Sequence, residues 1–114
     1  MRVTQTSLPG VLRIELEAHT DARGRFVRVF DAPVYAAAGI PVDFAQDNVS
    51  VSGSRVLRGL HFQHRAPQGK LLGVLEGAIY DVAVDLRADS ACFGRWVGMM
   101  LDAADPGQVW VPPG

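Results

Sequence analysis

Short runs of alternating apolar and polar residues, separated by turns that contain glycine, proline or aspartate, recur along most of the chain. The clearest run spans residues 78–86, where Tyr80, Val82 and Val84 fall on one face and Asp81 and Asp85 on the other. A period of two residues is typical of strands. Further strands are predicted at residues 11–17, 26–30, 42–45, 56–62, 71–75, 94–101 and from residue 108 onward. Such a series of short strands predicts an all-β sandwich or barrel.

A single short helix is expected near residues 32–38. Asp31 can cap its first turn, Pro33 suits that turn because its missing N–H would have no partner there, and Gly39 can end it.

Length and composition restrict the class of protein. At 114 residues, with 48% hydrophobic residues, the chain is expected to form one domain over residues 1–114. A formal net charge of -1 argues against nucleic acid or an anionic membrane as a partner. No apolar run is long enough to cross a bilayer, no signal peptide is visible, and a single cysteine, Cys92, fits a reducing compartment. These features predict a soluble, cytoplasmic protein.

Residues 56–70 combine basic and apolar side chains in a way that favours proton chemistry. His61 titrates near neutral pH and is the natural general base, and Lys70 could stabilise an anion that forms beside it. The alternative is that His61 is a hydrogen-bonded core histidine and Lys70 a solvated surface charge.

Three arginines, Arg23, Arg25 and Arg28, surround the turn of a predicted hairpin. They form either an anion site, because guanidinium groups match phosphate oxygens, or a solvated basic turn.

Gln46, Asp47 and Asn48 follow a short apolar segment and form either a turn or a set of hydrogen-bonding groups for a ligand. No metal site is expected. His61 and His64 are three residues apart, and a regular strand would direct them to opposite faces.

Longer motifs follow one another along nearly the whole chain. They are Asp21-Ala-Arg-Gly-Arg-Phe26, Gln46-Asp-Asn-Val-Ser50, Val56-Leu-Arg-Gly-Leu-His-Phe-Gln63, Gln68-Gly-Lys-Leu71, Asp81-Val-Ala-Val-Asp-Leu-Arg87, Phe93-Gly-Arg-Trp-Val-Gly98 and Gln108-Val-Trp-Val-Pro-Pro-Gly114. In order and spacing this series resembles the dTDP-4-dehydrorhamnose 3,5-epimerase family.

The resemblance implies a cupin-type jelly roll, or double-stranded β-helix, that forms a homodimer by exchanging amino-terminal strands. It also implies a dTDP-4-keto-6-deoxy sugar as substrate, namely dTDP-4-dehydro-6-deoxy-D-glucose in dTDP-L-rhamnose biosynthesis, and neither a metal nor an organic cofactor. Catalysis falls to His61 as base and to Lys70 near the sugar O4, where enolate charge collects. Substrate binding falls to Arg23 and Arg58 on the diphosphate and to Gln46, Asp47 and Asn48 on the nucleotide.

Arg58 and His61 are three residues apart, so a regular strand would separate them, although their implied roles require one pocket. We therefore expect a bulge or strong twist at Gly59 and Leu60.

Three features depart from the family pattern. Arg28 stands where a glutamate is usual, and the segment from His61 to Lys70 is one residue short. The chain ends at Gly114, before the family's tyrosine proton donor and the aspartate that orients its histidine, so we expect a jelly roll without its carboxyl-terminal strands.

Three hypotheses follow. The first is a 3,5-epimerase, the second a relative that inverts carbon 3 alone, and the third a non-catalytic cupin that binds nucleotide sugars or dimerises.

Overall fold

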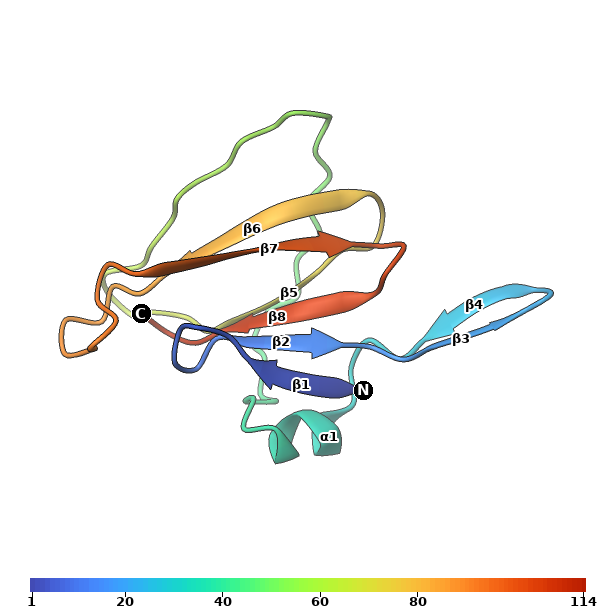
Figure 1. Ribbon diagram of the computed structural model, residues 1–114, viewed down its shortest axis with the longest axis horizontal. Coiled ribbons are helices and arrows are strands. Elements are labelled where there is room, and N and C mark those ends of the chain that lie inside the picture. The colour runs from blue at the N-terminus through green and yellow to red at the C-terminus, as the bar shows by residue number, and fades with distance from the viewer.

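The computed structural model describes residues 1–114 and consists mainly of strands, with one short helix, as predicted (Figure 1). In chain order the elements are β1 (Arg2–Gln5), β2 (Leu12–Glu15), β3 (Ala18–Asp21), β4 (Gly24–Val27), α1 (Ala32–Ala37), β5 (Lys70–Gly73), β6 (Ala78–Val84), β7 (Trp96–Asp102) and β8 (Gly107–Val111). The single helix, α1, lacks the length and apolar character needed to cross a membrane.

Four strands form one antiparallel sheet in the order β1-β2-β8-β5. The last strand in sequence therefore lies in the interior of the sheet, with Ile14 opposite Gln108 on one side and Leu71 opposite Trp110 on the other. Strands β3 and β4 form a separate hairpin, and so do β6 and β7. The strands do not close into a barrel.

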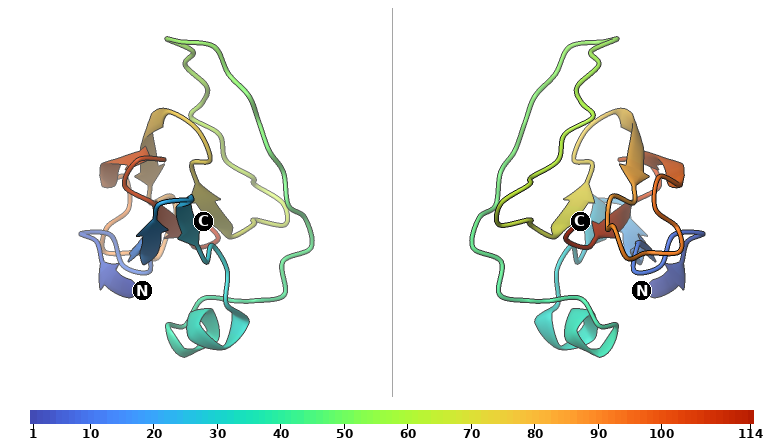
Figure 2. Two further views of the ribbon diagram at one scale, coloured as in Figure 1. Left: turned by 90° about the vertical axis from the view of Figure 1, so that its right-hand side faces the viewer. Right: turned by 90° about the vertical axis from the view of Figure 1, so that its left-hand side faces the viewer.

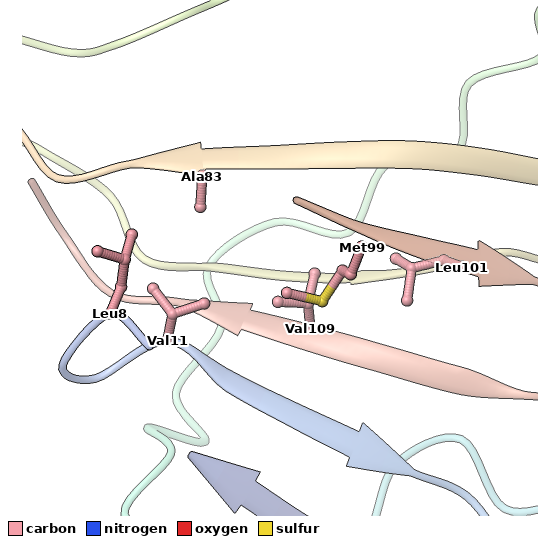
Figure 3. Close-up of a cluster of buried hydrophobic side chains, with 6 residues drawn as sticks. All are labelled: Leu8, Val11, Ala83, Met99, Leu101 and Val109. Carbon is pink, nitrogen blue, oxygen red and sulfur yellow. The ribbon is translucent and has the colours of Figure 1, made fainter. Parts of the chain in front are cut away.

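An apolar core fills the space between the four-stranded sheet and the β6–β7 hairpin (Figure 3). Side chains alternate along a strand, so one face of β8 points at the hairpin while one face of the hairpin points back. Burial contributes on the order of 1.5–3 kcal/mol for each larger side chain, which holds the hairpin on the sheet. The buried members are Leu8, Val11, Ala83, Met99, Leu101 and Val109.

Helix α1 covers the opposite face of the sheet. Asp31 caps it as predicted, since its Oδ1 accepts a hydrogen bond from the Val34 N–H at 3.4 Å. Beyond the helix Gly39 has a φ of 78°, a conformation that favours glycine. A second core joins the helix to the sheet, and its buried members are Ile14, Tyr35, Ile40 and Trp110.

The strand predictions at residues 11–17, 71–75, 78–86, 94–101 and from 108 are confirmed, with shifts of a few residues at the ends. The strand predicted at 26–30 is found earlier, as β4. Two strands were not predicted. Strand β1 lies ahead of the first predicted run, and β3 has four exposed residues next to an expected turn.

The strands predicted at residues 42–45 and 56–62 are wrong. Residues 42–69, called the arm below, contain no helix or strand, and none of the 39 backbone–backbone hydrogen bonds involves them. These segments contain apolar residues typical of strands, but no neighbouring strand forms backbone hydrogen bonds with them. A β-strand requires such a hydrogen-bonded neighbour.

The arm stands away from the layered body on one side and returns to it at β5 (Figure 2). Its apolar side chains are exposed to solvent, in contrast to those of the two cores. The large ones are Val42, Phe44, Val49, Val51, Val56, Leu57, Leu60 and Phe62.

Candidate functional site

Most of the predicted site residues lie on the arm and are exposed. Lys70 is the first residue of β5, also exposed, and Arg23 lies in the turn of the β3–β4 hairpin. The residues on the arm are Gln46, Asp47, Asn48, Arg58 and His61.

Trp110 anchors both ends of the arm to the sheet. The Phe44 ring meets the Trp110 ring edge to face, with their centroids 6.2 Å apart. At the other end Gly69 lies against the same indole, so closely that a Cβ at this position would overlap the ring. Gln46 follows Phe44 by two residues and Lys70 follows Gly69, so one buried tryptophan brings the two ends of the predicted site towards each other.

The middle of the arm has few contacts. The Arg58 guanidinium donates hydrogen bonds to the Ser52 hydroxyl at 3.1 and 3.3 Å, and both residues belong to the arm. The His61 imidazole lies beside Gly59, whose φ of 108° favours glycine. The backbone is irregular at Gly59, as expected, but the prediction of a bulge within a strand is wrong because no strand exists there.

The expected arginine cluster is divided among three separate contacts. The Arg23 guanidinium donates two hydrogen bonds to one oxygen, Asp21 Oδ2, at 2.7 and 3.0 Å, and this contact lowers the pKa of the Asp21 carboxyl. Arg28 pairs with Asp31 at 2.8 Å. Arg25 donates to the carbonyls of Ala103 and Ala104 in the β7–β8 turn, at 2.6 and 2.9 Å. Within one chain the arginines therefore do not converge on an anion site.

Asp81, in β6, and Asp85, directly after this strand, point to the same inward face but have opposite environments. Asp85 is 4% exposed and accepts hydrogen bonds from Arg87 and Ser90, which hold the pKa of its carboxyl well below the usual range. Asp81 is half-buried, no side-chain hydrogen bond reaches it, and burial raises its pKa.

Sequence reasoning assigned no role to Asp81. The sequence nevertheless contains a signal for this residue, because a carboxylate at an inward position of the clearest predicted strand is unusual. In the structure Asp81 lies on the same face as Ala83 and opposite Met99. A raised carboxyl pKa is common at functional sites, which makes Asp81 a candidate functional residue in its own right.

No three His, Cys, Asp or Glu side chains lie close enough together to hold a metal ion. The predicted site residues are an imidazole, cationic groups and hydrogen-bonding groups, which are suited to proton transfer and anion binding.

Comparisons with known proteins cover almost all of the chain. The sequence model of the family described as dTDP-4-dehydrorhamnose 3,5-epimerase matches residues 5–114. The dTDP-4-dehydrorhamnose 3,5-epimerase of Methanothermobacter thermautotrophicus is 46% identical over 113 residues, which are 99% of this chain and 61% of the relative. This chain thus spans about three fifths of that relative's length.

Solved structures share the fold. The dTDP-6-deoxy-D-glucose-3,5-epimerase of Legionella pneumophila Philadelphia 1, in complex with dTDP-4-keto-L-rhamnose, is 43% identical. It matches with a TM-score of 0.94 over 99% of this chain and 61% of its own. ChmJ, a 3'-monoepimerase from Streptomyces bikiniensis in complex with dTDP-quinovose, is 35% identical. Its TM-score is 0.88 over 96% of this chain and 56% of its own. These neighbours have the cupin-type jelly-roll fold that the motifs led us to expect. This chain belongs to the dTDP-4-dehydrorhamnose 3,5-epimerase family.

Proposed function

We propose that this chain contributes the base and the anion-stabilising cation of an isomerase. The enzyme would invert carbons 3 and 5 of dTDP-4-dehydro-6-deoxy-D-glucose in dTDP-L-rhamnose biosynthesis. The observation that carries the proposal is the family match over residues 5–114, which includes the motifs with His61 and Lys70. The Legionella relative, solved with a dTDP-linked 4-keto sugar, supports the substrate class.

The chemistry follows from the 4-keto group. The protons on carbons 3 and 5 are acidic because the ketone at carbon 4 accepts the electrons that their removal leaves behind. His61 takes the proton, the enolate charge develops on O4, and the Lys70 ammonium stabilises it more than it stabilises the neutral ketone. Arg23 and Arg58 bind the diphosphate, and Gln46, Asp47 and Asn48 bind the nucleotide.

Inversion also needs an acid on the opposite face of the enolate. Tyr35 is 1% exposed and hydrogen-bonded to Val29 and Gln108, so it does not supply that proton. Tyr80 is exposed, but it lies outside the family's donor motif. We therefore propose that the 114 residues form one cupin-like unit that removes substrate protons slowly and forms little epimer by itself. In a homodimer, Arg23 of one subunit would reach the site of the other.

Deuterium exchange tests this function. The chain is incubated with the 4-keto sugar nucleotide in heavy water, and carbons 3 and 5 are followed by proton NMR. We expect exchange at both carbons, reduced about 100-fold by His61→Asn, the usual scale for a lost general base. His64→Asn is the matched control, because His64 is also an exposed histidine on the arm. Equal exchange in wild type and His61→Asn would contradict the proposal.

The same experiment separates the alternatives. Deuterium at carbon 3 alone would indicate a 3-epimerase, the activity of the ChmJ relative. Binding of the sugar nucleotide without exchange at either carbon would indicate a non-catalytic nucleotide-sugar-binding cupin, which the exposure of His61 favours.

A further inference from the structure

The hydrogen bonds that tie the β3–β4 hairpin to the layered body come from one side chain, that of Arg25. Strands β3 and β4 pair only with each other, and no backbone–backbone hydrogen bond joins residues 18–27 to the rest of the chain. The hairpin extends beyond one end of the body, and all but one of its strand residues are exposed (Figure 1). A two-stranded hairpin on its own is marginally stable in water, so its orientation depends on this contact.

The turn that receives Arg25 is itself fixed in the body. The Ala103 N–H donates to the Gly77 carbonyl at 2.9 Å, and the Ala104 N–H donates to the Asp102 carboxylate at 2.8 Å. The carbonyls of these two alanines accept no hydrogen bond other than those from Arg25, at 2.6 and 2.9 Å. A guanidinium donates from two nitrogens in parallel, so one arginine engages both carbonyls.

Charge favours the same contact. Asp102 and Asp105 flank the two alanines, and residues 101–107 contain no cationic side chain. The Arg25 guanidinium therefore approaches a turn of opposite charge, and a charged donor makes a stronger hydrogen bond than a neutral one. Because the contact is exposed to solvent, we expect it to orient the hairpin and to add little to the stability of the fold.

We propose that Arg25 is a positioning residue, which fixes the hairpin so that Arg23 in its turn can reach the diphosphate of a dTDP-linked substrate. The anchoring of the hairpin stands on the contacts of Arg25 alone, whereas its consequence for substrate binding rests on the proposed function. His61 and Lys70 lie outside the hairpin. Loss of Arg25 should therefore weaken binding and leave the proton-transfer step unchanged.

The first test measures the mobility of the hairpin in Arg25→Ala. Backbone order parameters from ¹⁵N relaxation are about 0.85 for a rigid backbone and below about 0.6 for a flexible one. We expect Arg25→Ala to bring residues 18–27 into the flexible range and to leave the four-stranded sheet rigid, which also shows that the variant folds. Arg95→Ala is the matched control, because Arg95 is an exposed arginine outside the hairpin. Unchanged order parameters in the Arg25→Ala hairpin would overturn the proposal.

The second test measures binding and chemistry separately. If the freed hairpin takes the competent orientation about a tenth of the time, the Kd for dTDP and the KM for deuterium exchange both rise about tenfold. The kcat for exchange should change less than about twofold, because the proposed base and cation are untouched. A loosened hairpin with unchanged dTDP affinity would overturn the positioning role.

Arg25→Lys separates positioning from a direct charge effect on the ligand. Lysine keeps the charge but lacks the fork that engages two carbonyls, so both the order parameters and the dTDP affinity should lie between wild type and Arg25→Ala. Wild-type affinity in Arg25→Lys together with a mobile hairpin would contradict positioning. A wild-type chain that bound no dTDP would contradict the proposed function, while the order parameters would still decide whether Arg25 anchors the hairpin.

Discussion

The layered body and the arm both contain apolar residues at strand spacing, yet they differ in the burial of those residues and in backbone hydrogen bonding. In the body, Leu101 is 3% exposed and Val109 is fully buried, whereas in the arm Leu57 is 92% exposed. The buried polar side-chain atoms of the body all have hydrogen-bond partners, while the only side-chain hydrogen bonds within the arm are those from Arg58 to Ser52. Apolar residues at strand spacing are therefore not enough, because a strand also needs a neighbour at the correct distance.

The largest effect is expected at the residue that joins the two regions. Trp110→Ala removes a 6% exposed indole from the second core and both anchors of the arm, and should lower the free energy of unfolding by about 3–5 kcal/mol. Chemical denaturation measures this. Trp96→Ala is the matched control, because Trp96 is 61% exposed and its loss should cost less than about 1 kcal/mol. Similar losses for the two variants would mean that Trp110 does not join the regions.

The same substitution placed in each region tests the comparison directly. Leu101→Ala should cost about 2–5 kcal/mol, because it leaves a cavity among Met99, Val109 and their neighbours. Leu57→Ala should change the free energy of unfolding by less than about 0.5 kcal/mol. A large loss on truncation of Leu57 would show that the arm packs against the body in solution.

A smaller effect, dependent on pH, is expected at Asp85. Its pKa is lower in the folded chain than the unfolded value of about 3.9, so its ionised form stabilises the fold above about pH 5, and this stabilisation is lost as the pH falls further. Asp85→Asn should lower the free energy of unfolding at pH 7 by about 2–3 kcal/mol and flatten its decline in acid. Equilibrium unfolding in urea between pH 2 and 7 measures both.

The exposed pair of Asp21 and Arg23 supplies the control for that measurement. Asp21→Asn should lower the free energy of unfolding far less than Asp85→Asn does, because solvent screens this ion pair. If Asp21→Asn altered the acid profile as much as Asp85→Asn, burial would not be what distinguishes the two carboxylates.

Local signals were sufficient where the chain folds on nearby residues. The alternation in residues 78–86 predicted β6, and Asp31 and Gly39 marked the ends of α1. The sequence pattern does not predict strand β1, because this short strand at the edge of the sheet is mostly exposed and lacks a clear apolar alternation. The strand predicted at residues 56–62 is wrong although its residues suit a strand, because no other strand of the structure pairs with them.

In the candidate site, too, the sequence predicted what depends on local motifs and not what depends on contacts between distant residues. The motifs predicted the family, and the match of the family model to residues 5–114 confirmed it. The roles of the individual site residues stay predictions. Spacing could not predict that Arg23 would bind Asp21, or that His61 would stay exposed, because both depend on contacts made in three dimensions. The partly buried carboxyl of Asp81 needed the structure for the same reason.

The position of β8 inside the sheet has a consequence for the order in which the protein folds. Strand β2 ends at Glu15 and pairs with β8, which begins at Gly107, so the centre of the sheet forms only after the residues between these two strands have been synthesised. Before then the chain can form three hairpins, β1–β2, β3–β4 and β6–β7, but it keeps unpaired strand edges, a state prone to aggregation. Contacts so distant in sequence also slow the search for the native pairing.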